Sequence, residues 1–246
     1  MKDSKTQIQE FVISAPNFHM SNVTIDTVIF GFHKGQLKVL LQRFLDTDYY
    51  VLPGGYIGKE ENISDAAVRI LKERTSLDNI YLEQFYTFGN TNRLNVELLN
   101  KLILENQLQL TKDNWFIQRY VSICYYSLVN YEKVKPVSGM FSLESIWFDV
   151  YKLPLLLFDH KEMIIKALET LQFDIDRKLN GFNLMGETFT MKELKSLYEA
   201  VFQKKILRAN FQRKILGLDI VERLEKKFDG KAHKAPYLYR FKLLGK

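Results

Sequence analysis

A glycine-rich turn followed by a helix, between Gly54 and Leu77, constrains the fold of this chain more than any other stretch. Pro53, Gly54 and Gly55 are expected to interrupt the strand that precedes them. Ser64 and Asp65 are good N-cap residues for the following helix. Apolar residues then recur at helical spacing, together with one arginine, at Ala66, Ala67, Ile70, Leu71 and Arg74. A glycine loop that leads into a helix with carboxylates is typical of a diphosphate or metal site.

This stretch resembles the Nudix box, with Gly55, Glu61, Arg69, Leu71, Glu73 and Leu77 in register. In that family the helix carboxylates bind the divalent cation that activates a phosphoanhydride. Here Ile70 and Arg74 stand where the family has glutamates, and Ser76 stands where it has glycine. Positions 70, 73 and 74 are expected to share one helical face. Because Mg²⁺ needs several oxygen ligands, one carboxylate beside an isoleucine and an arginine does not suit it.

The resemblance therefore implies a Nudix fold that lacks the glutamates for metal-dependent hydrolysis. No catalytic residue, metal or cofactor is expected. An ion pair between Glu61 and Arg69 is expected to hold the loop against the helix. The alternative is an active Nudix hydrolase that uses Glu61, Glu73 and Mg²⁺ on a nucleoside diphosphate derivative such as ADP-ribose.

The composition indicates a folded intracellular protein. Hydrophobic residues make up 46% of the 246 residues, which is enough for a packed core. The single cysteine, Cys124, excludes a disulfide within the chain and fits a reducing cytoplasm. No apolar run approaches the ~20 residues of a membrane span, and the polar start MKDSKTQIQE lacks the apolar region of a signal peptide. None of the four histidines pairs with another at metal-ligand spacing.

Strand patterns surround the box between residues 21 and 175, the expected extent of the Nudix-like domain, and residues 1–20 are expected to be a loose lead-in. Residues 23–32 and 37–44 predict a hairpin that turns at Gly35. Further strands are expected at 81–90, 115–131 and 145–151, and a helix from Asp159, with capping-box spacing to Glu162, to about Leu171. Residues Val96–Leu110 predict an amphipathic helix inside an insertion at about 92–112. It is an extra helix at the sheet edge, a pocket lid, a dimer contact, or the contact surface of a protein-binding adaptor.

Candidate ligand-binding residues follow from position alone, at strand ends and near the insertion. They are Arg43, Phe88, Asn92, Arg93, Arg119 and His160.

Residues 181–246 predict a second, basic domain. They hold 15 of the 35 Lys and Arg residues but only 7 of the 29 Asp and Glu residues. Thr190 and Glu193 have capping-box spacing for a first helix. A second helix at about Arg208–Leu216 is expected to end at Gly217, and a hairpin with a basic tip at Asp229-Gly230 follows. This order is typical of a winged helix-turn-helix.

DNA contacts are expected from the second helix, the residues before it and the wing. Arginine, lysine and amide side chains supply donors for bases and phosphates. The candidates are Lys204, Lys205, Arg208, Asn210, Gln212, Arg213, Lys214, Lys227, Lys231 and Lys234.

Taken together, the chain resembles bacterial transcription regulators with a Nudix-like N-terminal domain and a C-terminal winged helix. The stretches LFDHKEM and GFNL…FTMKELKSLYEAV…NFQRKI are most similar to the arabinose-responsive repressor branch. The resemblance implies an α+β fold, in which a Nudix-like α/β/α sandwich with a mixed sheet precedes the winged helix. It also implies a homodimer on double-stranded operator DNA. Its expected role is repression of sugar catabolism genes, under the control of a small-molecule effector that is a sugar or a sugar derivative.

Overall fold

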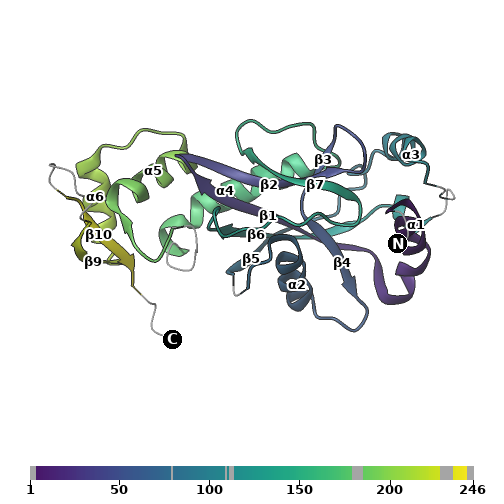
Figure 1. The fold of residues 1–246 in the computed structure, drawn as a ribbon, viewed down its shortest axis with the longest axis horizontal. Helices are drawn as coiled ribbons and strands as arrows, with labels where there is room; N and C mark the ends of the chain where they lie inside the picture. The colour runs from purple at the N-terminus through teal and green to yellow at the C-terminus, as the bar shows by residue number, and fades with distance from the viewer. Residues whose placement is uncertain are drawn as a thin grey trace.

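The computed structural model describes residues 4–78, 80–108, 110, 114–178, 185–227 and 235–242. The described chain forms two lobes along its long axis (Figure 1). The larger lobe is built on a seven-stranded sheet, and the smaller lobe holds a three-stranded sheet with two helices. None of the helices in the described part is long and apolar enough to cross a membrane.

The long strand β1 (His19–His33) organises the larger sheet. It turns into β2 (Gln36–Phe44) through Lys34 and Gly35, whose φ angles of 48° and 77° suit a tight hairpin turn. β1 runs parallel to β6 (Val121–Val129), whereas its pairing with β2 is antiparallel. The remaining strands all pair antiparallel, namely β3 (Tyr50–Val51), β4 (Gly54–Gly58), β5 (Leu82–Phe88) and β7 (Ser142–Asp149). The sheet is therefore mixed, which confirms the prediction.

Helices cover both faces of this sheet. Successive side chains of β1 point to opposite faces, so each face presents apolar residues against which a helix can pack. Ile25 and Ile29 are buried on the side of α2 (Ile63–Thr75). Val28 and Phe30 are buried on the side of α4 (His160–Lys178). The expected α/β/α sandwich is thus confirmed, with α4 continuing well beyond the predicted end at Leu171.

The first twenty residues are not the loose lead-in that was expected. They form helix α1 (Ser4–Phe18), which buries Ile8, Val12 and Ala15 along one face. Ile8 and Val12 belong to the same hydrophobic cluster as α3 (Val96–Glu105), the helix of the insertion. The sequence of α1 alone did not predict this buried face, because the residues that cover it lie far away in the sequence. The insertion helix also ends five residues before the predicted Leu110.

The strand before the Gly54–Leu77 stretch, β3, ends at Val51, so the predicted interruption is confirmed, but the stretch itself begins as a strand rather than as a turn. Gly54 and Gly55 open β4, and a Cβ at Gly55 would lie 2.9 Å from Cδ1 of Ile70. Glycine is therefore required because α2 packs directly on this strand. Asn62, rather than Ser64 or Asp65, is the N-cap residue of α2.

The smaller lobe has the predicted winged-helix order. Strand β8 (Phe189–Thr190) precedes α5 (Met191–Phe202), and the capping box between Thr190 and Glu193 is confirmed. Helix α6 (Arg208–Gly217) follows, and then strands β9 (Val221–Lys226) and β10 (Tyr237–Phe241) pair antiparallel. Helix α6 ends at Gly217, as predicted, but its C-cap residue is Leu218, and the positive φ of 55° is at Asp219 rather than at the glycine. The predicted wing turn at Asp229-Gly230 lies outside the described residues.

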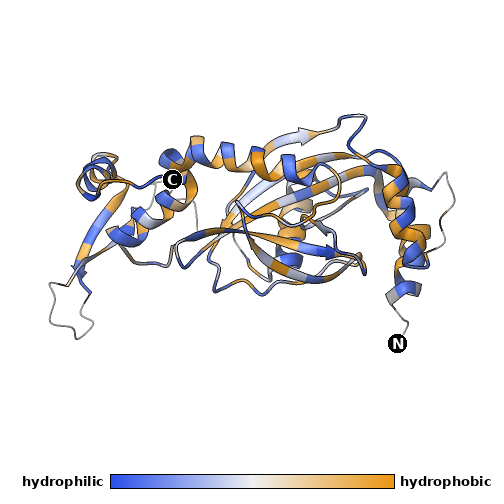
Figure 2. Ribbon diagram, turned by 90° about the horizontal axis from the view of Figure 1, so that it is seen from above, coloured by the Kyte–Doolittle hydropathy of each residue, from blue (hydrophilic) through white to orange (hydrophobic). Residues whose placement is uncertain are grey.

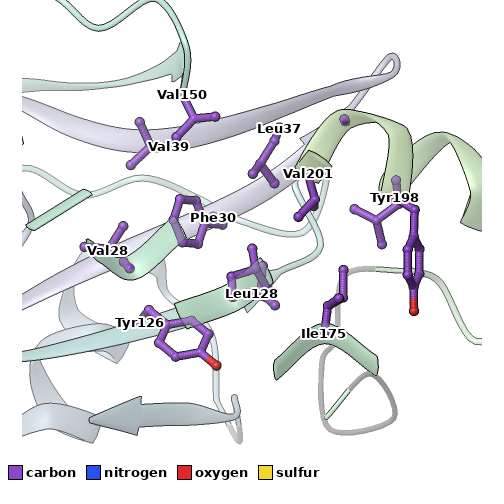
Figure 3. Close-up of a cluster of buried hydrophobic side chains, with 14 of the residues drawn as sticks. Val28, Phe30, Leu37, Val39, Tyr126, Leu128, Val150, Ile175, Tyr198 and Val201 are labelled. Carbon is purple, nitrogen blue, oxygen red and sulfur yellow. The ribbon is translucent and has the colours of Figure 1, made fainter. Parts of the chain in front are cut away.

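The two lobes share one hydrophobic core. Tyr198 and Val201 of α5 face the same cluster as Leu37 of β2 and Ile175 of α4 (Figure 3). The Val201 carbonyl also accepts hydrogen bonds from the larger lobe, from Tyr151 Oη at 2.7 Å and from Gln172 Nε2 at 2.8 Å. Hydrophobic residues gather in the central sheet and its helices, whereas α6 at the far end is mostly hydrophilic (Figure 2). α4 packs on the sheet of the larger lobe and, near its other end, contacts the polar outer helix α6.

Candidate functional site

A cavity of about 390 Å³ opens beside the first half of β1. This volume lies in the range of small-molecule sites in proteins. Its walls come from every strand of the larger sheet except β5, from helices α1, α2, α3 and α4, and from the loops between them, including the segment before β7. Three parts of the lining differ in chemistry, namely an aromatic wall, a polar floor and a cationic edge.

The aromatic wall consists of Phe11, Tyr56, Phe116, Tyr120 and Phe141. The rings of Phe11 and Tyr56 lie 5.7 Å apart, and those of Phe116 and Phe141 stack at 4.6 Å. Burial raises the pKa of the Tyr56 and Tyr120 hydroxyls well above the usual range, so both remain protonated donors. Such a wall suits a flat aromatic or heterocyclic ring.

The polar floor is formed by Asp26, Arg93, Ser122 and His160. The Leu52 N–H donates to His160 Nδ1 at 3.0 Å, so the neutral ring carries its proton on Nε2. That Nε2 lies 4.0 Å from Asp26 Oδ1. Burial lowers the pKa of His160, which keeps the ring neutral at physiological pH.

Arg93 connects strands β5 and β6 beneath this floor through hydrogen bonds. Its Nη2 lies 2.8 Å from Asp159 Oδ1, and both side chains are buried. Its Nη1 donates to the carbonyls of Phe88 and Tyr120 and to Ser122 Oγ. Asp159 precedes the first turn of α4, so this ion pair fixes the start of that helix against β5 and β6.

The cationic edge is formed by Arg69, Glu73 and Arg74 of α2. Arg69 Nε donates to Glu61 Oε1 at 2.7 Å, which confirms the predicted ion pair between loop and helix. The Arg69 guanidinium holds the pKa of Glu61 down to about 2. Arg69 also donates to Glu73 at 3.1 Å and to the Tyr56 carbonyl at 3.0 Å. Both carboxylates of the box are thus engaged by one arginine.

Ile70, Glu73 and Arg74 lie three and four residues apart in helix α2, so they share one helical face, as predicted. Glu73 and Arg74 line the cavity, whereas Ile70 is fully buried under Gly55. No three His, Cys, Asp or Glu side chains in the described part of the chain converge in a metal-binding group. With a hydrocarbon and a guanidinium at two of the three positions, this donor set does not fit Mg²⁺.

Of the six candidate ligand-binding residues, Arg93 and His160 line the cavity. Phe88 is a buried core residue of β5, and Asn92 and Arg119 are exposed. Arg43 pairs with Asp46 and Glu144 at 3.5 and 3.4 Å. These four are outside the cavity lining because position near a strand end does not determine which face a side chain occupies.

Sequence reasoning missed most of the lining. Asp26 is the one carboxylate in a strand rich in β-branched and aromatic residues, and this was an available signal for a functional position. Phe11 and Phe141 come from a helix and a loop that reach the cavity only through tertiary packing. Their role has no signal in the local sequence.

The candidate DNA-binding residues lie mainly on the outer face of α6 and just before it. Lys204, Lys205, Arg208, Asn210, Arg213 and Lys227 are exposed, Gln212 is half-buried, and Lys231 and Lys234 lie outside the described residues. Phe211 and Ile215 form the buried stripe, as predicted. Lys214 differs from the others because its Nζ lies 2.7 Å from Asp176 Oδ2 of α4.

Comparison with known proteins agrees with this two-lobed arrangement. Residues 181–241 match the family model described as the NrtR DNA-binding winged helix domain. The crystal structure of Shewanella oneidensis NrtR superposes with a TM-score of 0.67 at 27% identity, covering 90% of this chain and 94% of that one. The chain is thus similar to the NrtR-like, Nudix-related transcriptional regulators over most of its length.

Two further relatives extend the comparison. The ADPR responsive transcriptional repressor NtrR of Acinetobacter baylyi is 29% identical over 230 residues, which cover 90% of this chain and 82% of that protein. Shewanella oneidensis NrtR complexed with a 27mer DNA superposes with a TM-score of 0.66 at 25% identity, covering 89% of this chain and 93% of that one.

Proposed function

We propose that this NrtR-like chain is a DNA-binding repressor whose larger lobe binds a nucleotide sugar without hydrolysing it. The observation that carries the proposal is the cavity, which places an aromatic wall beside a cationic edge. A heterocyclic base can stack on the wall, and a phosphate can meet the edge. The Acinetobacter relative is described as ADP-ribose responsive, and ADP-ribose combines these parts with a sugar.

The DNA-binding part of the proposal is supported by α6. Its exposed donors Arg208, Asn210 and Arg213 are of the types that read guanine, adenine and phosphate. The NrtR of Shewanella oneidensis has been crystallised with DNA, and its fold is shared here. Lys214 is left out of this contact set because it pairs with Asp176.

Ligand binding would control DNA binding through a shift of helix α4. This helix starts beside the pocket at Asp159 and His160, and Asp176 near its other end contacts Lys214 of α6. Its 19 residues span roughly 28 Å. A ligand that shifts the start of a rigid helix also shifts the position of its end, which would change how two α6 helices in a homodimer match two half-sites.

The effector is tested by thermal unfolding with a panel of ADP-ribose, free sugars and sugar phosphates. A ligand at about one hundred times its Kd stabilises the folded state by about 2.7 kcal/mol. Stabilisation by ADP-ribose and not by arabinose supports the nucleotide sugar. Stabilisation by a free sugar alone would instead favour control by that sugar, as in the arabinose-responsive branch.

The remaining parts of the proposal need different measurements. Light scattering tests the homodimer, and selection of bound fragments from a genomic library tests whether the operators lie before sugar catabolism genes. Hydrolysis is tested by following ADP-ribose with excess Mg²⁺. Turnover that is abolished by Glu73→Gln would establish the hydrolase alternative and contradict the proposed sensor.

A further inference from the structure

Among the arginines of the pocket, Arg74 has the weakest pairing of its charge with a carboxylate. Its side chain is only 16% exposed, and Glu73 Oε2 lies 4.0 Å from its Nη1. Its Nη2 donates to the Gly54 carbonyl at 3.3 Å. Its Nε is buried and has no hydrogen-bond partner among the described residues. A buried cation without a close counterion is costly, so this arrangement calls for an anion from outside the chain.

The neighbouring carboxylates do not supply that anion. Glu61 accepts two hydrogen bonds from Arg69, at 2.7 and 2.8 Å. Glu73 accepts from Arg69 at 3.1 Å, closer than its 4.0 Å approach to Arg74. Arg93, by contrast, is buried and uses all three of its nitrogens, in bonds to Asp159, Ser122 and backbone carbonyls. Among these three arginines, Arg74 is the one with a buried nitrogen that has no hydrogen-bond partner among the described residues.

The backbone of Arg74 is held firmly in position. The Val137 N–H donates to the Arg74 carbonyl at 3.0 Å, and the Lys135 N–H donates to the next carbonyl, that of Thr75, at 3.1 Å. Gly139 lies so close that a Cβ there would be 3.3 Å from Arg74 Nη2. A guanidinium held in place before the ligand arrives loses little freedom on binding.

We infer that Arg74 binds the diphosphate of the ligand directly and takes the place of the divalent cation. The inference rests on the proposed nucleotide-sugar function and on the misfit between this donor set and Mg²⁺. Arginine is charged at every physiological pH and presents donors that match phosphate oxygens. Binding of a diphosphate ligand in this pocket is therefore independent of divalent metal.

The test is calorimetric titration of the full chain with ADP-ribose and with inorganic pyrophosphate, each in excess EDTA and in excess MgCl2. Equal ADP-ribose affinity in the two buffers is expected. An affinity that appears only with Mg²⁺ overturns the metal-independent site and leaves the nucleotide-sugar function standing. Binding of pyrophosphate but not ADP-ribose in EDTA supports the anion site and contradicts the proposed effector. Binding of neither ligand in EDTA overturns the inference.

Variants at position 74 test whether Arg74 is the residue that binds the diphosphate. Arg74→Gln is expected to weaken ADP-ribose by roughly ten- to a hundredfold, the effect of losing a charged hydrogen bond. Arg74→Lys keeps the charge and is expected to recover part of the loss. Lys72→Gln removes a charge from the exposed side of the same helix, where Lys72 pairs with Asp78 at 2.6 Å, and is the matched control with wild-type affinity.

The stability of the ligand-free protein separates a binding role from a structural one. Because Arg74 is poorly compensated, the ligand-free Arg74→Gln variant should unfold at the wild-type temperature or above it. Wild-type affinity in Arg74→Gln overturns the inference. A variant that fails to fold, or melts well below the wild type, also overturns it, because Arg74 would then be structural.

Discussion

Lys214 Nζ of α6 lies 2.7 Å from Asp176 Oδ2 of α4. The same ammonium lies 5.0 Å from the centre of the Tyr198 ring, and the Tyr198 hydroxyl donates to Asp176 Oδ1 at 2.8 Å. Three helices therefore meet at one carboxylate. Since the other end of α4 holds His160 at the pocket, this contact links the proposed reading helix to the helix that begins at the cavity.

Asp176→Asn is expected to reduce the effector response. The substitution removes the ion pair with Lys214, so that α6 follows the position of α4 less closely. The ratio of DNA affinities without and with ADP-ribose should fall by several-fold, within the roughly 1–3 kcal/mol typical of coupling between sites. Fluorescence anisotropy of labelled operator DNA measures this ratio. Glu169→Gln, an exposed change on the same helix, is the control. An equal ratio in Asp176→Asn and wild type would remove this contact from the coupling.

Arg213→Ala is expected to weaken operator binding by about 1–3 kcal/mol, because an exposed arginine on α6 can contact a base or a phosphate. A gel-shift titration at fixed salt measures the effect. Lys101→Ala on α3, at the opposite end of the molecule (Figure 1), removes an equally exposed charge and should leave the affinity unchanged. Equal losses in both variants would mean that only net charge matters and that α6 is not the reading helix.

Arg93→Ala is expected to destabilise the fold by about 3–5 kcal/mol, because it leaves the buried carboxylate of Asp159 unpaired. Denaturant unfolding measures the loss. The exposed Arg119 gives the matched comparison, and Arg119→Ala should change stability by less than about 0.5 kcal/mol. Similar values for the two variants would show that the Arg93 ion pair adds nothing to the fold.

The sequence predicted the fold better than the site, for a physical reason. The hairpin of β1 and β2, the Thr190 capping box and the Glu61–Arg69 pair depend on neighbours close in sequence, and all three are confirmed. The pocket lining depends on which distant segments meet. Phe11 reaches it because its ring packs against Tyr56 and Phe141, and Arg43 does not because β2 directs it towards Glu144. Such placements follow from tertiary packing, which no local pattern encodes.

Glu61→Gln is expected to change how stability depends on pH. The Arg69 guanidinium lowers the pKa of Glu61 from 4.5 to about 2, so the ion pair stabilises the fold above about pH 4.5. That contribution is lost as the pH falls from 4.5 towards 2. The variant should therefore be less stable by about 1–2 kcal/mol at neutral pH, with a smaller difference in acid. Denaturant midpoints measured across this range test it. A difference that stays constant with pH would contradict the ion-pair account.

The most direct test of the whole account is titration of ADP-ribose into the full chain bound to labelled operator DNA, in excess EDTA. The same samples are then assayed for intact ADP-ribose. The account predicts that anisotropy falls to the value of free DNA while all the ADP-ribose remains intact. DNA that stays bound at saturating ADP-ribose, or release only after the nucleotide sugar has been cleaved, would contradict it.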